Sequence, residues 1–278
     1  MDNTLGCNTL YPHGRLNDVK TQFTLDAQKQ ALTDVKDGGF AACEFSHSEH
    51  LTLAECDALR EECARIDLLP WSAHSWVSLP AAAGRVEEAL PKLLANLDAT
   101  EHLGAGVMVV HAAGGDQDMT QSEPRSARAE ALQAVLPPLS EQAAPRDIVI
   151  AIENCGPKAD LEFLIETVSA LDLPGIGFNI DTGHAVLKGL DAGEAIRLMG
   201  ARLVTTHIQD NFGERDDHLP PGLGTIDWPS VMAAFREVGY RRTLMVEISD
   251  CPPGREPVAR EDIRTAFENL TRFAGGVA

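Results

Sequence analysis

The chain has 278 residues, 44% of them apolar and 23% charged, which is ordinary for a folded globular protein. Its 42 acidic residues outnumber 23 basic ones, giving a formal net charge of -19. An acidic surface repels phosphate groups, so the composition disfavours nucleic acid and anionic membranes as partners. No apolar stretch has the length of a membrane span, and the amino terminus does not resemble a signal peptide. The six cysteines are scattered without a CxxC pair, so we expect reduced thiols in a cytoplasmic protein.

Apolar, strand-like segments alternate with helix-like segments along the chain. Strands are predicted over residues 5–10, 40–45, 68–76, 106–111, 147–153, 175–180, 202–208 and 243–248. Strands separated by helices pair in parallel, and eight such units close into an α/β barrel of the (β/α)8 TIM type. A doubly wound open sheet would normally show a glycine-rich turn after the first strand, and CNTLYPHG is not one. We therefore expect a single TIM-barrel domain over residues 1–278.

Capping signals mark the helices between these strands. Thr52 with Glu55 forms a predicted capping box, and Asp191 with Glu194 repeats the pattern. Asp227 is placed to cap the next helix, where a proline in the first turn is favourable. Helix ends are predicted at the glycines Gly38, Gly39, Gly104 and Gly239.

Polar residues fall at the carboxyl ends of the predicted strands. They are His74, His111, Glu153, Asp181, His184, His207 and Glu247. In a parallel barrel these ends open onto one face, so the side chains should converge. Each residue alone has an ordinary explanation, as a structural histidine or a solvated carboxylate, but that explanation must then hold on every one of these consecutive strands. A carboxylate that follows core sequence such as VIAI or LMV needs a buried partner or a cation.

The predicted cluster is therefore a divalent metal site. Three carboxylates and one imidazole form an oxygen-rich ligand set that suits Mn²⁺, Mg²⁺ or Co²⁺ and accommodates Zn²⁺ through the imidazole. The sequence Asp181-Thr-Gly-His184 brings His184 towards the same site. Two roles are open for this histidine: contact with the bound groups, or orientation of Asp181 from behind.

Two long segments are predicted to be loops at the barrel rim, 114–127 and 207–228. The second brings Arg215, Asp216 and His218 towards the rim, and loops of this length within a compact domain are usually functional.

Aromatic residues offer stacking surfaces for a sugar, although each is equally well explained by packing. They are Trp71, Trp76 and Trp228. No glycine-rich loop suited to a phosphate stands out, which favours an unphosphorylated substrate.

Several motifs together resemble the sugar phosphate isomerase/epimerase group of the xylose-isomerase-like TIM barrel superfamily. They are VVHAAGG, IAIENCG, FNIDTGHA, THIQDN, DDHLPPGLGTIDW and LMVEIS, in the family's order and over nearly the whole chain. The resemblance implies that Glu153, Asp181, His207 and Glu247 bind the metal. It also implies that Glu153 and Glu247 exchange protons with the substrate through a metal-stabilised enediolate.

The resemblance also implies contacts with the substrate. His184 matches a histidine that contacts a substrate hydroxyl, and Arg215 lies near the family's arginine with a different spacing. The expected substrate-binding residues are His74, His111, His184, Arg215 and His218.

The zinc-dependent apurinic-site endonucleases of the same superfamily are a second resemblance. Their three-zinc ligand pattern can be matched by His74, His111, Glu153, Asp181, His184, His207, Asp216, His218 and Glu247. The acidic charge weighs against a DNA enzyme. A lyase or dehydratase acting on a keto-sugar is a third alternative, and a non-enzymatic binding barrel is the least favoured.

The favoured hypothesis is a metal-dependent isomerase or epimerase of a sugar, keto-sugar or inositol derivative. Its expected partner is a small carbohydrate, with neither nucleic acid nor membrane. The sequence leaves the oligomeric state open, a homo-oligomer included.

Overall fold

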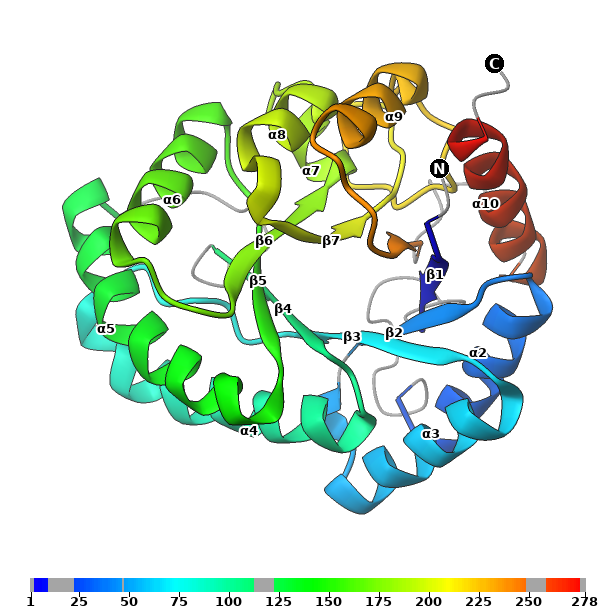
Figure 1. The fold of residues 1–278 in the computed structure, drawn as a ribbon, viewed down its shortest axis with the longest axis horizontal. Coiled ribbons are helices and arrows are strands. Elements are labelled where there is room, and N and C mark those ends of the chain that lie inside the picture. Colours follow the sequence, from blue (N-terminus) through cyan, green and yellow to red (C-terminus); the bar gives the residue numbers. More distant parts are fainter. Residues whose placement is uncertain (1–2, 10–22, 47, 113–122, 249–258, 276–278) are drawn as a thin grey trace.

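Eight parallel strands surround the centre of the molecule, in the order β7-β6-β5-β4-β3-β2-β1-β8 (Figure 1). The structure is a computed structural model that describes residues 3–9, 23–46, 48–112, 123–248 and 259–275. The strands are β1 (Leu5–Asn8), β2 (Ala42–Ser46), β3 (Leu69–Ser75), β4 (Val107–His111), β5 (Val149–Glu153), β6 (Ile176–Asp181), β7 (Leu203–His207) and β8 (Leu244–Val246).

A short bridge between the chain after β7 and strand β8 nearly closes the sheet. Ile208 pairs in parallel with Val246. The Ile208 N–H donates to the Met245 carbonyl at 2.8 Å, and the Glu247 N–H donates to the Ile208 carbonyl at 3.0 Å. The predicted TIM barrel is thus confirmed. Strand β8 is the shortest and ends just before Glu247, which the sequence had placed inside the strand.

Helices form the outer ring of the barrel (Figure 1). They are α2 (Leu25–Asp37), α3 (Leu53–Ile66), α4 (Val86–Leu103), α5 (Arg125–Ala143), α6 (Lys158–Leu171), α7 (Thr182–Leu187), α8 (Ala192–Met199), α9 (Trp228–Glu237) and α10 (Ala259–Ala274). The part of the chain that the structure describes contains no helix long and apolar enough to cross a membrane.

The predicted caps are present. Thr52 and Glu55 form a reciprocal capping box at the start of α3. The Asp191 side chain accepts the Glu194 N–H at 2.8 Å at the start of α8. Asp227 caps α9. These side chains satisfy N–H groups that a helix start leaves without a backbone partner, so they fix where each helix begins.

One predicted loop is partly wrong. Of the segment 114–127, residues 114–122 lie outside the described residues. Helix α5 already begins at Arg125, so the last three residues are helical. The sequence RSARAEAL is rich in strong helix formers, which extends the helix into the polar segment.

Alternation along the strands separates the two faces of the sheet. Outward residues pack beneath the helices in the main core, among them the buried thiol of Cys43, whose Sγ lies 3.8 Å from that of Cys63. The five cysteines in the described part are buried and free, as predicted. Cys251 lies outside it.

The barrel interior is apolar towards the amino ends of the strands. Val107, Val109, Ala151 and Val204 form a small inner cluster with Trp71 packed against it. The Trp71 indole N–H donates to Thr205 Oγ1 at 2.9 Å. Trp71 is therefore a packing residue and not a stacking surface. Since side chains alternate with period two, the residues that follow Val109 and Ala151 on the same face are His111 and Glu153. The interior thus becomes charged at the carboxyl end.

Candidate active site

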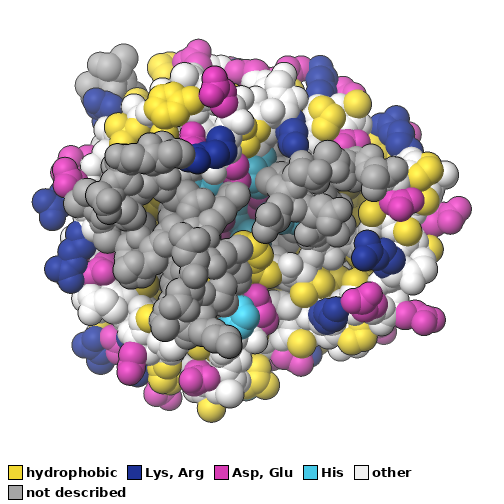
Figure 2. Space-filling view, turned by 180° about the vertical axis from the view of Figure 1, so that it is seen from behind, with side chains coloured by type: hydrophobic (Ala, Val, Ile, Leu, Met, Phe, Trp, Pro, Cys, Tyr) yellow, Lys and Arg dark blue, Asp and Glu magenta, His cyan; other side chains and the backbone are white. Residues whose placement is uncertain are grey.

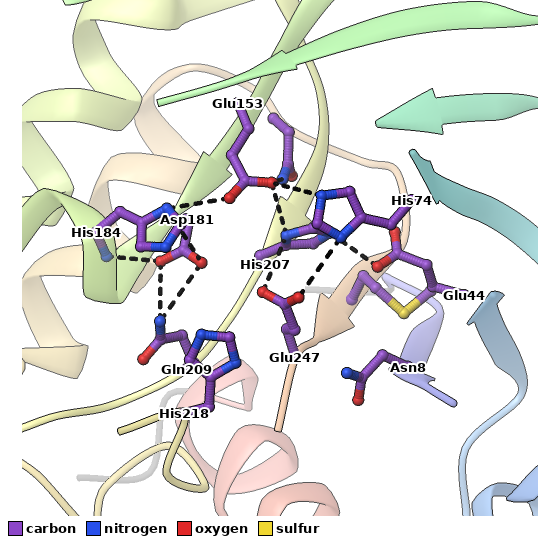
Figure 3. Close-up of polar contacts among 12 residues, drawn as sticks. Asn8, Glu44, His74, Glu153, Asp181, His184, His207, Gln209, His218 and Glu247 are labelled. Atoms are coloured by element: carbon purple, nitrogen blue, oxygen red, sulfur yellow. Dashed lines mark hydrogen bonds and ion pairs between the residues drawn. The ribbon is translucent and has the colours of Figure 1, made fainter. Parts of the chain in front are cut away.

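Four strand ends meet at the carboxyl mouth of the barrel. Glu153 ends β5, Asp181 ends β6, His207 ends β7 and Glu247 follows β8. One ligand atom from each lies within 4.8 Å of the others, and all four residues are buried (Figure 3). The predicted convergence of these residues is confirmed. In Figure 2, histidine and acidic side chains are visible at the centre of the face turned to the viewer.

His207 lies between three carboxylates. Its Nδ1 is 2.9 Å from Glu153 Oε2 and 3.1 Å from Glu247 Oε2, while Nε2 is 2.9 Å from Glu44 Oε1. Burial alone would lower its pKa, but Glu247, Glu44 and Glu153 together raise the pKa well above the usual value. Without a metal, His207 is therefore an imidazolium that balances the acidic cluster.

Glu153 is held by an amide donor on one oxygen, and a histidine ring lies close to the other. The Asn179 amide donates to Oε2 at 2.9 Å, and His184 Nδ1 lies 3.0 Å from Oε1. Burial acts to raise the pKa of this carboxyl, but the positive charges of His207 and His111 hold the pKa well below its usual value. The pKa of Glu247 is likewise lowered, mainly by His207 acting against burial. Both glutamates are therefore carboxylates able to bind a cation or accept a proton.

Asp181 caps helix α7 while facing the site. Its Oδ1 accepts the His184 N–H at 2.7 Å. Asn154 fixes the backbone by donating to the Asp181 carbonyl at 2.9 Å and accepting the Asp181 N–H at 2.7 Å. Burial, reinforced by Glu153 and Glu247 against the opposing effect of His184, raises the pKa of Asp181 to about 6. The neighbouring positive charges do not fully balance the charge of this buried carboxylate, so a cation would stabilise it.

His184 and the loop after β7 form the adjoining side of the site. His184 Nε2 lies 3.4 Å from Asp216 Oδ2, and His218 Nε2 lies 3.0 Å from the same oxygen. Gln209 Nε2 donates to Asp216 Oδ1 at 2.7 Å and to Asp181 at 3.3 Å. The His184 backbone thus orients Asp181 and its ring faces the site, while its expected contact with substrate stays a prediction.

The loop is folded around the buried carboxylate of Asp210. This carboxylate accepts the Gly222 N–H at 2.9 Å and the Trp228 indole N–H at 2.8 Å. Gly224 passes so close that a Cβ there would lie 2.3 Å from the Asn211 carbonyl oxygen. Trp228 is buried and stacked on Phe273, with ring centroids 5.6 Å apart. It anchors the loop and offers no surface for a substrate.

The Arg215 side chain pairs with a residue of its own loop. Its Nη2 lies 2.6 Å from Asp217 Oδ1, and the side chain is about half exposed. Asp217 is buried and holds the arginine at this position. The expected contact of Arg215 with substrate stays a prediction.

His74 and His111 lie side by side at the site, with ring centroids 4.8 Å apart. His111 Nε2 lies 3.3 Å from Glu153 Oε1. Within the described ranges neither ring nitrogen of His74 makes a hydrogen bond, although Glu153 and Glu247 oxygens lie 3.9 and 3.8 Å away. Burial and the neighbouring His111 lower the pKa of His74 to about 3, so its ring is neutral. The Trp76 ring lies 6.0 Å from it, the one predicted aromatic that borders the site.

Sequence reasoning missed several polar residues that support this site. They are Asn8, Glu44, Ser72, Asn154, Asn179 and Gln209. Glu44 follows the apolar run AAC near the end of β2, so the rule that identified Glu153 also applies to it. Asn179 precedes Asp181 by two residues and therefore shares its face of the strand.

The chain belongs to the xylose isomerase-like TIM barrel family, whose model matches residues 32–269. Inosose isomerase of Bacillus subtilis is 28% identical over 142 residues, covering 48% of this chain and 51% of that protein. The chain spans about half the length of the curated relatives it matches.

Solved structures share the fold over nearly the whole chain. A D-tagatose 3-epimerase-like protein superposes with a TM-score of 0.77 at 21% identity, covering 99% of this chain and 98% of that one. The IOLI protein, solved with a bound zinc atom, gives a TM-score of 0.76 at 19% identity, with 99% of each chain covered.

Proposed function

We propose that the protein is a divalent-metal-dependent isomerase or epimerase of a sugar, keto-sugar or inositol derivative. The observation that carries the proposal is the buried set Glu153, Asp181, His207 and Glu247, in which two glutamates flank one histidine. Relatives named inosose isomerase and structural neighbours named ketose 3-epimerases support this class of reaction.

The residues present fit a metal. Three buried carboxylates lie in one cluster, and at Asp181 their combined negative charge exceeds what the neighbouring histidines balance. The raised pKa of Asp181 reflects this excess. Three carboxylates with one imidazole form a ligand set for Mn²⁺, Mg²⁺, Co²⁺ or Zn²⁺, and the zinc atom of the IOLI protein structure favours trying zinc first.

When bound, the metal would polarise the substrate carbonyl and stabilise the negative charge that develops on its oxygen. Glu153 and Glu247 are ionised, and from the ends of β5 and β8 they approach His207 Nδ1 from opposite directions (Figure 3). One removes the proton from the carbon beside the carbonyl, and the other returns a proton from the opposite side. His184 and His218, whose rings both face Asp216, are expected to contact substrate hydroxyls.

Neutral polar atoms near β1 and β2 favour a hydroxyl-rich substrate. Within the described residues, Asn8 Nδ2 and Ser46 Oγ are buried without a hydrogen-bond partner. Asn8 Oδ1 accepts the Ile248 N–H at 3.2 Å, so its amide group is held beside Glu247 (Figure 3). Buried donors without partners are costly unless a ligand satisfies them.

The proposal is tested by metal analysis of the purified protein followed by a screen of ketoses, inosose and 3-keto-glycosides. Metal-dependent conversion of one of them is expected. Lyase or dehydratase chemistry begins with the same proton removal, and it would appear as loss of water or of a glycosidic group. A metal-loaded protein that changes none of these compounds would oppose the proposal.

Metal binding should strengthen as the pH rises. In the metal-free protein the pKa of His207 is well above its usual value, so a metal must displace one proton from Nδ1 at neutral pH. Below about pH 6 Asp181 also becomes protonated, and a second proton must leave. Affinity should therefore rise about tenfold per pH unit near neutrality and more steeply below pH 6.

Isothermal titration calorimetry of metal binding, in buffers of different ionisation enthalpy, measures this proton release. The control is His102→Ala, which changes a partly exposed histidine paired with Asp57 on the outer helices and should leave the slope unchanged. The range from pH 5.5 to 7.5 includes the pKa of Asp181. A metal affinity that does not vary over this range would contradict the proposed ligands.

A multi-zinc phosphodiesterase is the second candidate, because further ligand groups flank the central one. His74, His111 and Glu153 form one such group, and Asp181, His184 and His218 form another. We expect one ion per chain and, given the net charge of -19, no binding of abasic duplex DNA above that of an unrelated acidic protein. Three ions per chain together with incision of abasic DNA would favour the phosphodiesterase.

A further inference from the structure

Glu44 is a carboxylate buried inside the barrel that neither the sequence motifs nor the proposed reaction uses. It lies on β2, paired in register with Ser72 of β3 and Asn8 of β1, and it is fully buried. Among the described residues, no lysine or arginine pairs with it. A buried carboxylate without such a partner is costly, so its surroundings should show what stabilises it.

One hydrogen bond and one ion-pair contact hold the Glu44 carboxylate. Ser72 Oγ donates to Oε2 at 2.6 Å, and Oε1 lies 2.9 Å from His207 Nε2 (Figure 3). One oxygen is therefore fixed to a neighbouring strand, while the other faces the ring of the central histidine. Ser72 orients the carboxylate, and the carboxylate in turn faces His207.

The His207 ring presents different partners on its two nitrogens. Nδ1 faces Glu153 and Glu247, the residues proposed to bind the metal, at 2.9 and 3.1 Å. Nε2 faces Glu44, on the other side of the ring. A histidine that binds a metal through one nitrogen keeps its proton on the other, and an acceptor there fixes the ring and increases its basicity.

We propose that Glu44 is a positioning residue, which keeps the proton of His207 on Nε2 and turns Nδ1 towards Glu153 and Glu247. This inference rests on the proposed metal site. Glu44 acts through His207 and touches neither the metal nor the substrate. Ser72 supports it by holding the second carboxylate oxygen.

A competing arrangement makes Glu44 itself a ligand. Glu44, His74, His207 and Glu247 each offer an atom within 4.8 Å of the others. An ion held there would be lost as a whole when Glu44 is changed. A positioning residue would instead lower the affinity of the site and leave the number of ions unchanged.

The test compares Glu44→Ala, Glu44→Gln and Ser72→Ala with the unaltered protein, using Zn²⁺ as the probe and no substrate. Glu44→Ala should lower zinc affinity ~10- to 100-fold at unchanged stoichiometry, the usual effect of removing an acceptor behind a histidine ligand. In Glu44→Gln the amide oxygen can accept from Nε2 while the NH₂ donates to Ser72, so most of the affinity should return. Ser72→Ala should have the smallest effect.

A second readout follows His207 directly. NMR of the zinc-loaded, ¹⁵N-histidine-labelled protein should show a protonated Nε2 that exchanges slowly with solvent in the unaltered protein and in Glu44→Gln, and faster in Glu44→Ala. Circular dichroism confirms that each variant is folded, and Glu44→Gln carries the test if Glu44→Ala is not.

Unchanged zinc affinity and unchanged Nε2–H exchange in Glu44→Ala would overturn the inference. So would the loss of one whole ion, or a failure of Glu44→Gln to restore affinity. Both readouts are independent of turnover, so a protein that converts no sugar but shows these zinc effects would refute the proposed reaction alone. If the unaltered protein binds neither zinc nor another divalent ion, both proposals fail.

Discussion

The Asp181→Ala protein should be isolated free of divalent metal. Asp181 is the carboxylate of the cluster with a pKa raised to about 6, which indicates that its charge is underneutralised without a cation. Its removal takes away one of the four proposed ligands and also the side chain that accepts the His184 N–H. Loss of even an outer partner of a metal ligand costs ~10- to 100-fold in affinity, so losing a ligand should cost more than about 100-fold.

Elemental analysis after dialysis against metal-free buffer measures the occupancy. Asp26→Ala is the matched control, because Asp26 is an exposed residue in the first turn of α2. It should retain metal like the unaltered protein. Full occupancy in Asp181→Ala would place the metal elsewhere in the molecule.

Glu153→Gln and Glu247→Gln should each lose turnover by a factor of ~10² to 10⁴, the usual contribution of a positioned acid or base. Glutamine keeps an oxygen that can face the metal, but it cannot accept a proton from carbon. Both glutamates have pKa values below normal, so in the unaltered protein both are available as bases near neutrality.

Turnover is measured at saturating metal, with occupancy determined on the same samples. Glu61→Gln, at an exposed position of α3, is the matched control and should keep full activity. A glutamate whose glutamine variant keeps its metal and works within a few-fold of the unaltered enzyme is not a catalytic acid or base. His184 or His218 would then be the next residues to test.

The sequence was sufficient to predict the barrel, because local signals agree with the global fold. Capping residues such as Thr52 and Asp227 begin helices where expected, and each apolar run becomes a strand. The strand-end rule brought Glu153 and Asp181 together without any knowledge of contacts, since parallel strands in a barrel all end on one face.

The sequence could not predict roles that depend on the direction in which a side chain points. The sequence was equally consistent with packing and with substrate stacking for Trp71 and Trp228. The hydrogen bonds of Trp71 to Thr205 and of Trp228 to Asp210 show that both are packing residues. The rule that identified Glu153 also applies to Glu44, but a carboxylate within an apolar segment does not show which partner it faces. Arg215 lies near the family's arginine with a different spacing, and its geometry depends on the neighbouring Asp217.

The central claim is that the metal-loaded protein removes a proton from the carbon beside the carbonyl of a keto-sugar or inosose. NMR of inosose and a panel of ketoses in D₂O, with the Mn²⁺- or Zn²⁺-loaded enzyme, measures this step directly. The account predicts enzyme-dependent deuterium incorporation at that carbon, lost when the metal is chelated and lost in Glu153→Gln or Glu247→Gln. A fully metal-loaded protein that leaves every such carbon unlabelled would contradict it.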